Sequence, residues 1–225
     1  KFFKLAQQAE LAKKDKEASE YYKKACLLGG AGGCINHGHF LAKFGEVDLA
    51  KKMYLLACDH KASRGCTNLG GLEKKLGNLK AAKKYYKKAC DLNDGMGCAD
   101  LGYLEEKTGN SAFGTKLYHK SCALKFGRGC YNSAVDEKNS KFKKAFFEKA
   151  CNFKFGRGCA KLGNLEERAG KSTLAKKLYK KGCDYNSGLS CYNFGTSQKG
   201  KSKKEFFLKS CRLNLGQGCL GLGAL

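Results

Sequence analysis

Fourteen cysteines in a fixed pattern constrain the fold of this chain more than any other feature. They form seven Cys-x7-Cys pairs with none left over, and the first members of successive pairs are 32, 32, 32, 29, 32 and 28 residues apart. A near-constant period of this size is typical of an array of repeated units and not of one or two globular domains. The pairs are Cys26 with Cys34, Cys58 with Cys66, Cys90 with Cys98, Cys122 with Cys130, Cys151 with Cys159, Cys183 with Cys191, and Cys211 with Cys219.

An amphipathic helical pattern, here named helix B, precedes the first cysteine of each pair. Counting back from that cysteine, position −1 is always small, position −4 is always aromatic and position −5 is always apolar. Position −8 is small in five of the seven repeats. These positions share one face of an α-helix, and the other face is rich in lysine. We therefore predict a helix that buries its small and aromatic residues and exposes its lysines.

A second helical pattern, helix A, starts at the second cysteine of each pair. A Leu-Gly step or its equivalent follows three and four residues later, and the pattern ends at a glycine turn such as Gly77-Asn78. Glycine inside a helix costs stability, so its recurrence predicts that two helices approach closely there. Two repeats are three or four residues shorter, and we expect the shortening in the turn between helices. The recurring glycines are Gly70, Gly102, Gly163, Gly195 and Gly223.

The spacing of each cysteine pair favours a disulfide over a metal site. In one continuous helix, residues eight apart are separated by about 12 Å, beyond the roughly 7 Å that a disulfide spans. Small residues before each second cysteine allow the chain to reverse, so the bridge would join helix B to the next helix A. Zinc sites usually show closer cysteine spacing, only four histidines are present, and four-cysteine sites would leave one pair over. We expect neither metal nor cofactor.

Disulfides also predict where the protein works, because they persist in oxidising compartments. We therefore expect a periplasmic or secreted protein. No signal peptide is visible in this chain, and we expect that it has been removed. No stretch approaches the roughly 18 apolar residues of a membrane span, so none is expected.

Residues 85–98 combine a Lys-rich Tyr-Tyr-Lys-Lys-Ala-Cys segment with a Cys-x7-Cys link, and Gly-Cys-x-x-Leu-Gly follows. This combination resembles the disulfide-bridged Sel1-like repeats of the Helicobacter cysteine-rich protein family, although the turn into helix B is shorter here. The resemblance covers nearly the whole chain. It implies an all-α fold, a right-handed α/α solenoid of Sel1-like, TPR-like hairpins, with residues 1–225 as one domain of about seven repeats. It also implies export and protein or peptide binding, or alternatively penicillin binding with slow β-lactam hydrolysis.

Fragments of a serine β-lactamase signature occur, but they are incomplete. Such enzymes need Ser-x-x-Lys, Ser-Asp-Asn and Lys-Thr-Gly. Ser140-Lys141-Phe142-Lys143 and Lys107-Thr108-Gly109 match the first and third motifs at predicted turns, whereas Ser-Asp-Asn is absent. We therefore assign no catalytic residue. Recurring helix A carboxylates are expected on the helix surface: Glu73, Glu105, Glu106, Glu166 and Glu167.

A surface is the better candidate site, because helix A usually lines the concave side of such solenoids. Two residues after the second cysteine, five of seven repeats have Asn or Asp, while Lys161 and Gly221 occupy the others. One amide per repeat is suited to binding the backbone of an extended peptide. The alternative is that Asn is simply tolerated near a helix N-terminus. The predicted groove comprises Asn36, Asn68, Asp100, Asn132 and Asn193, with His39, Tyr103 and Asn164 three positions further along.

The chain carries 44 Lys and Arg against 20 Asp and Glu, a net charge of +24. The aromatic residues of helix B lie on the predicted buried face, so no platform for stacking nucleic-acid bases is evident. Three interpretations stay open: a solvated exterior, adhesion to acidic envelope or host surfaces, and nucleic-acid binding, which is the least favoured. We expect a monomeric scaffold with a protein or peptide ligand.

Overall fold

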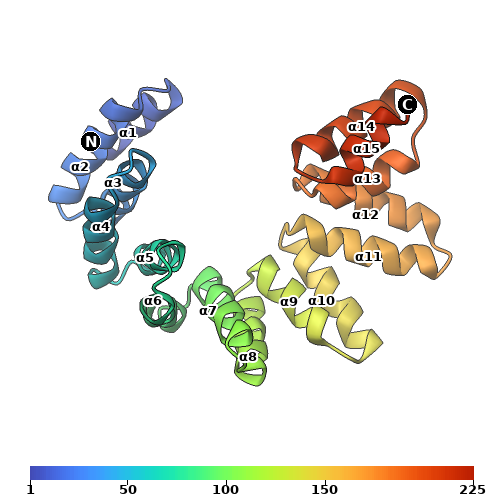
Figure 1. Cartoon of the computed structure of the whole chain (residues 1–225), viewed down its shortest axis with the longest axis horizontal. Helices are drawn as coiled ribbons and strands as arrows, with labels where there is room; N and C mark the ends of the chain where they lie inside the picture. The colour runs from blue at the N-terminus through green and yellow to red at the C-terminus, as the bar shows by residue number, and fades with distance from the viewer. The chain divides into compact units, whose positions relative to one another are not determined.

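The computed structural model describes residues 1–225, which form fifteen helices and no strand (Figure 1). The prediction of an all-α fold is therefore confirmed. In chain order the helices are α1 (Phe2–Leu11), α2 (Asp15–Leu27), α3 (Ala31–Lys43), α4 (Val47–Asp59), α5 (Ser63–Lys75), α6 (Leu79–Asp91), α7 (Gly95–Lys107), α8 (Ser111–Ala123), α9 (Gly127–Asp136), α10 (Ser140–Asn152), α11 (Gly156–Arg168), α12 (Ser172–Asp184), α13 (Gly188–Thr196), α14 (Gly200–Arg212) and α15 (Gly216–Gly223).

Even-numbered helices are the predicted helices B, and odd-numbered helices are the helices A. The chain divides into two compact units, residues 1–114 and residues 115–225. From α1 to α7 and from α9 to α15, each helix packs on the next one along the chain, and successive helices A also touch, as α5 does with α3 and α7. Stacked helical hairpins of this kind define an α/α solenoid.

The shortening of two repeats lies in helix A. α9 has 10 residues and α13 has 9, whereas α3, α5, α7 and α11 have 13 each. Residues 137–139 connect α9 to α10, a connection of the same length as residues 76–78 between α5 and α6. The prediction of a trimmed turn was therefore wrong. In the first of these repeats the connection anchors the next helix, because the Asn139 side chain caps α10 by accepting bonds from the backbone N–H groups of Lys141 and Phe142.

Pairs of small residues bring the end of helix B against the start of the next helix A. A Cβ added to Gly65 would lie 2.7 Å from the Cβ of Ala57, and one on Gly97 would lie 2.5 Å from the Cβ of Ala89. No second side chain fits beside the alanine in such a gap, which explains why glycine precedes the second cysteine in six of the seven repeats. The close approach puts the two cysteines within reach of each other.

The glycines inside helix A make room for the aromatic residue of helix B. A Cβ on Gly70 would lie 2.7 Å from the Tyr86 ring, and one on Gly163 would lie 2.5 Å from the Tyr179 ring. The predicted close approach is confirmed at these positions. At Gly223, in α15, a Cβ would meet no other atom of residues 1–225 within 4 Å.

Candidate functional site

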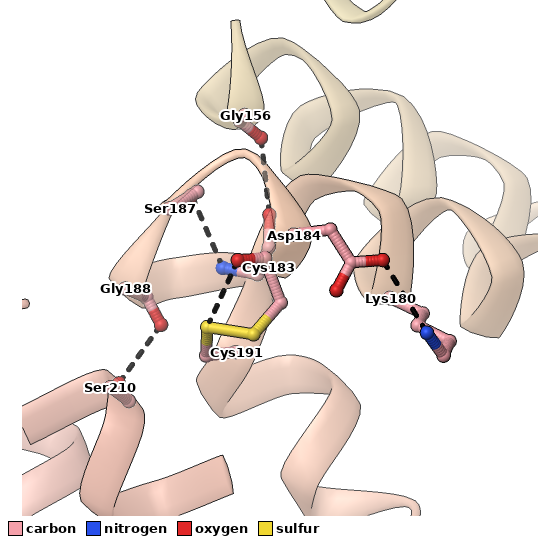
Figure 2. Close-up of a disulfide and its surroundings, with 9 residues drawn as sticks. Gly156, Lys180, Cys183, Asp184, Ser187, Gly188, Cys191 and Ser210 are labelled. Carbon is pink, nitrogen blue, oxygen red and sulfur yellow. Dashed lines mark hydrogen bonds and ion pairs between the residues drawn. A yellow bond between two sulfur atoms is a disulfide. The ribbon is translucent and has the colours of Figure 1, made fainter. Parts of the chain in front are cut away.

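Seven disulfides join the helices, with Cα–Cα distances of 4.4–4.7 Å. Each links the end of helix B to the start of the next helix A, as Figure 2 shows for the bridge between α12 and α13. The structure pairs the fourteen cysteines as the sequence pattern predicts: Cys26 with Cys34, Cys58 with Cys66, Cys90 with Cys98, Cys122 with Cys130, Cys151 with Cys159, Cys183 with Cys191, and Cys211 with Cys219.

The second cysteine of each pair therefore lies in the first turn of helix A, where its disulfide holds that turn against helix B. Cys34, Cys98, Cys130 and Cys159 are 2% exposed or less, because the close approach of the two helices covers them. Cys219, in α15 of the last repeat, is exposed instead. No cysteine is free, so none can serve as a nucleophile or a metal ligand.

Other features that would define a metal site or a membrane span are absent. No cluster of three or more His, Cys, Asp or Glu residues is arranged to hold a metal ion. No helix combines the length and the apolar character that crossing a membrane requires. The groove residues that the sequence predicts are therefore the candidate site.

The predicted groove residues all lie on helices A, and all are at least partly accessible to solvent. His39 and Tyr103 are exposed, and the six others are half-buried. His39, Asn68 and Asp100, from α3, α5 and α7, line one cavity of about 440 Å³ together with Tyr54 and Tyr86. The structure therefore brings three of the predicted residues together in the first unit.

The remaining groove residues lie outside this cavity. Tyr103 lies between two lysines, with the Nζ atoms of Lys74 and Lys107 at 4.8 and 5.7 Å from its ring centroid. In the second unit, Asn193 donates a hydrogen bond to the Asn164 side-chain oxygen at 3.1 Å. Asn36 and Asn132 are half-buried in α3 and α9.

Two of the amides hold the hydroxyl group of a buried tyrosine. The Tyr179 hydroxyl lies 2.7 Å from the Asn164 oxygen and 2.8 Å from a Glu167 oxygen, and it is also hydrogen-bonded to Asn193. Burial raises the pKa of Tyr179, and the bond to Glu167 raises it further. The amides thus satisfy a hydroxyl group that would otherwise be costly to bury.

Tyr22 has the same environment in the first repeat. Its hydroxyl donates to Glu10 at 2.9 Å and is hydrogen-bonded to Asn36. Burial and the bond to Glu10 together raise the pKa of Tyr22 to about 12. Both tyrosines therefore stay protonated at neutral pH.

A signal for this role is present in the sequence, although our sequence reasoning missed it. The five repeats with Tyr at position −4 of helix B have Asn or Asp two residues after the second cysteine. The two repeats with Phe147 and Phe207 have Lys161 and Gly221 there instead. Phenylalanine has no hydroxyl group to satisfy, so it needs no amide. The recurring amide therefore has a structural reason beyond tolerance near a helix N-terminus.

Two helix A carboxylates predicted on the surface are buried. Glu73 is 5% exposed and Glu166 is 3% exposed. They form ion pairs with helix B lysines of the preceding hairpin, Lys51 at 2.7 Å and Lys144 at 2.5 Å. The prediction was wrong because the stacking of hairpins covers this position of helix A.

The charge on Glu73 is maintained by its partners. Burial raises the pKa of this carboxyl, and hydrogen bonds from Lys51 and Asn78 more than reverse that effect, so that the pKa lies below its ordinary value. A hydrogen bond from Lys144 likewise lowers the pKa of Glu166. Both groups are ionised at neutral pH and link successive hairpins. They do not form an acid/base pair.

The two β-lactamase-like motifs occupy helix ends. Ser140 is the exposed first residue of α10. Thr108 follows the last residue of α7, where its hydroxyl donates to the Leu104 carbonyl at 2.9 Å and accepts from Lys83 at 2.7 Å. Neither motif has a general base or a set of oxyanion donors beside it in the described contacts.

Comparisons with known proteins agree with the observed fold. A family model of the tetratricopeptide repeat matches residues 63–95. A Sel1 repeat protein from Oxalobacter formigenes superposes with a TM-score of 0.72 at 16% identity, covering 99% of this chain and 100% of that chain. A putative Sel1 repeat protein from Klebsiella pneumoniae gives 0.51 at 15% identity, covering 77% and 98%. No curated protein matches the sequence.

A third similar structure is c5321, a protective antigen of uropathogenic Escherichia coli strains with an SLR fold. It superposes with a TM-score of 0.69 at 16% identity over 92% of this chain and 51% of that chain, so our chain spans about half of c5321. At such identities the likeness is one of fold. The protein has the α/α solenoid fold of these Sel1-repeat structures, with a disulfide at each of its seven cysteine pairs.

Proposed function

We propose that this protein is an exported scaffold that binds a peptide or protein segment through the cavity on α3, α5 and α7. Solenoids of this class present extended surfaces that generally bind other proteins. The observation that carries the proposal is the convergence of His39, Asn68 and Asp100 from three successive hairpins on one cavity. Their imidazole, amide and carboxylate groups offer both donors and acceptors to a peptide backbone.

The disulfides indicate an oxidising compartment, and we place the protein in the periplasm or outside the cell. The resemblance to the Helicobacter cysteine-rich protein family supports this assignment. The excess of lysine supports a further step, attachment to acidic envelope or host surfaces. Raising the salt concentration should then weaken binding to such surfaces steeply, because exposed charges are screened over about 10 Å at 0.1 M ionic strength.

The groove is tested by probing an unbiased array of short extended peptides with the oxidised protein and measuring the affinity of the bound peptides by calorimetry. We expect the double variant His39→Ala/Asn68→Ala to bind them at least about tenfold more weakly, a loss of about 1.4 kcal/mol. Asn193→Ala is the matched control, because Asn193 has the same repeat position as Asn68 and lies outside this cavity.

Thermal denaturation of each variant separates binding from folding, since the amide at this repeat position also has a structural role. Equal affinities of the wild type and a folded His39→Ala/Asn68→Ala variant would overturn the proposal. An equal loss in Asn193→Ala would also contradict it, because the loss would then report the repeat amides in general and not this cavity.

A further inference from the structure

A second and larger cavity lies between α2 and α4, against α3. Its volume is about 740 Å³, within the 300–1,000 Å³ typical of small-molecule sites. Its wall is mainly apolar and includes Leu27, Leu41, Phe44, Leu49, Met53 and Leu56. Because the cavity belongs to the first unit alone and uses none of the groove residues, it is independent of the proposed peptide site.

The equivalent cleft one repeat further along shows why this cavity is open. There, the Nζ of Lys51 lies 2.7 Å from a Glu73 oxygen, and this ion pair occupies a cleft of about 420 Å³. The same pair recurs as Lys83–Glu105 at 3.0 Å. At the first cavity, Ser19 stands in the lysine position and Leu41 in the glutamate position. Loss of the ion pair leaves an apolar space.

Two further departures from the repeat pattern line the same cavity. His37 occupies a position that is Leu or Phe in five of the other six repeats. Leu56 occupies a position that is Lys in all six others. If residues departed from the repeat pattern independently of one another, the unusual positions would be scattered over the chain. Their convergence on one cavity, together with Ser19 and Leu41, points to a site built into this hairpin.

The cavity contains one buried polar pair. Ser19 Oγ lies 3.0 Å from His37 Nδ1, and the two residues are 5% and 7% exposed. Burial lowers the pKa of His37, as does Lys23, while Glu20, Glu46 and the bond to Ser19 act in the opposite direction. The net effect leaves the imidazole neutral at pH 7. A neutral Ser–His pair can donate and accept a hydrogen bond but cannot offset a buried charge.

The charged groups around the cavity do not select an ion either. Lys16 and Lys23 are balanced by Glu20 and Glu46 among the lining residues. An ionised ligand would therefore lose its hydration without meeting a net opposite charge, whereas a hydroxyl or amide group would lose little. The combination favours a ligand with an apolar body and a single uncharged polar group.

We propose that this cavity binds a small uncharged amphiphile, with its apolar body against Leu41, Leu49 and Leu56 and its hydroxyl or amide group hydrogen-bonded to the Ser19–His37 pair. The site requires no other chain and no metal. A peptide or a second copy of the protein in the same cavity would be a different occupant.

The site is tested with the neutral fluorescent dye N-phenylnaphthylamine, displaced by decanol or by decanoate at pH 8. We expect one dye molecule per chain, and displacement by decanol at concentrations at least about tenfold lower than by decanoate, because only the alcohol is uncharged. His37→Leu should keep dye binding and weaken binding of decanol by about three- to tenfold, through loss of one hydrogen bond.

Two variants close the cavity with residues that other repeats already carry. Leu56→Lys and Ser19→Lys/Leu41→Glu should each weaken dye binding at least about tenfold. Leu55→Lys is the matched control, because Leu55 neighbours Leu56, lines the next cleft and is replaced by Lys in other repeats. It should bind dye like the wild type. Thermal denaturation establishes that each variant is folded, and Leu56→Lys carries the test if the double variant is not.

Four results would overturn the proposal: no saturable dye binding by the wild type, wild-type binding in folded Leu56→Lys, decanoate displacing the dye as well as decanol does, or dye binding that requires dimerisation. The last result would assign the cavity to a contact between two copies, which sedimentation in the presence and absence of dye detects.

Discussion

Ser190 faces the bare α-carbon of Gly182 across the Cys183–Cys191 disulfide. A Cβ on Gly182 would lie 2.2 Å from Ser190 Oγ. In the six other repeats the glycine precedes the second cysteine, and Ala or Ser precedes the first. In this repeat the two residue types are exchanged. The gap between the helices therefore holds one small side chain, and it accepts that side chain from either helix.

A serine on either side of the gap donates a hydrogen bond to an equivalent backbone carbonyl. Ser190 donates to the Gly156 carbonyl at 3.1 Å. Ser210 donates to the Gly188 carbonyl at 2.9 Å, as Figure 2 shows. Gly156 and Gly188 each lie three residues before a second cysteine. The exchange of residues in one repeat therefore preserves a hydrogen bond as well as the close packing.

The exchange at this disulfide gives a prediction for stability. Gly182→Ala should lower the free energy of unfolding by about 1–3 kcal/mol, because the new methyl group collides with Ser190. Adding Ser190→Gly should recover most of that loss, since it restores the arrangement of the other repeats. Urea denaturation of both single variants and the double variant measures the coupling. Strictly additive effects would contradict direct contact.

The buried ion pair between Lys51 and Glu73 predicts a pH dependence of stability. The pKa of Glu73 is lower in the folded protein than in the unfolded chain, so the unfolded chain binds more protons at mildly acidic pH. Its contribution is present above the unfolded pKa of about 4.3 and is lost as pH falls through the folded value. Glu73→Gln should therefore reduce the acid sensitivity of the denaturation midpoint. The exposed Glu148→Gln should not, and identical pH profiles for the wild type and Glu73→Gln would refute this account.

The tyrosine–amide contact predicts a compensated pair of substitutions. Tyr179→Phe should cost about 0.5–1.5 kcal/mol, since it removes a hydroxyl bonded to Asn164 and Glu167. Adding Asn193→Lys reproduces the combination found as Phe147 and Lys161, so the double variant should cost less than the sum of the single variants. Chemical denaturation is the measurement, and a double variant as costly as the sum would argue against the pairing.

Each disulfide should stabilise its repeat. Replacing both Cys58 and Cys66 by Ala should lower the free energy of unfolding by about 2–3 kcal/mol, chiefly because the unfolded chain gains freedom. Denaturation of the oxidised variant against the oxidised wild type measures the difference. Under reducing conditions the gap between the two proteins should shrink, and a gap that persists unchanged would assign the loss to packing.

Much of the architecture is encoded locally and was predictable. The cysteine period, the glycine turns and the stripes of small and aromatic residues act within about 30 residues, so the sequence alone indicated helical hairpins joined by disulfides. Even the partnership of Tyr179 with Asn193 is present as a repeat correlation. The close approach of Gly65 to Ala57 likewise follows from two small residues beside each cysteine pair.

What only the tertiary structure decided is how one hairpin lies against the next. The offset between hairpins determines that Lys51 reaches Glu73 and that Ser19 meets His37, contacts that no helical period predicts. It also buries carboxylates that the pattern of helix A assigned to the surface. The same offset collects four unusual side chains around one cavity, because residues from three helices meet there only after the hairpins have stacked.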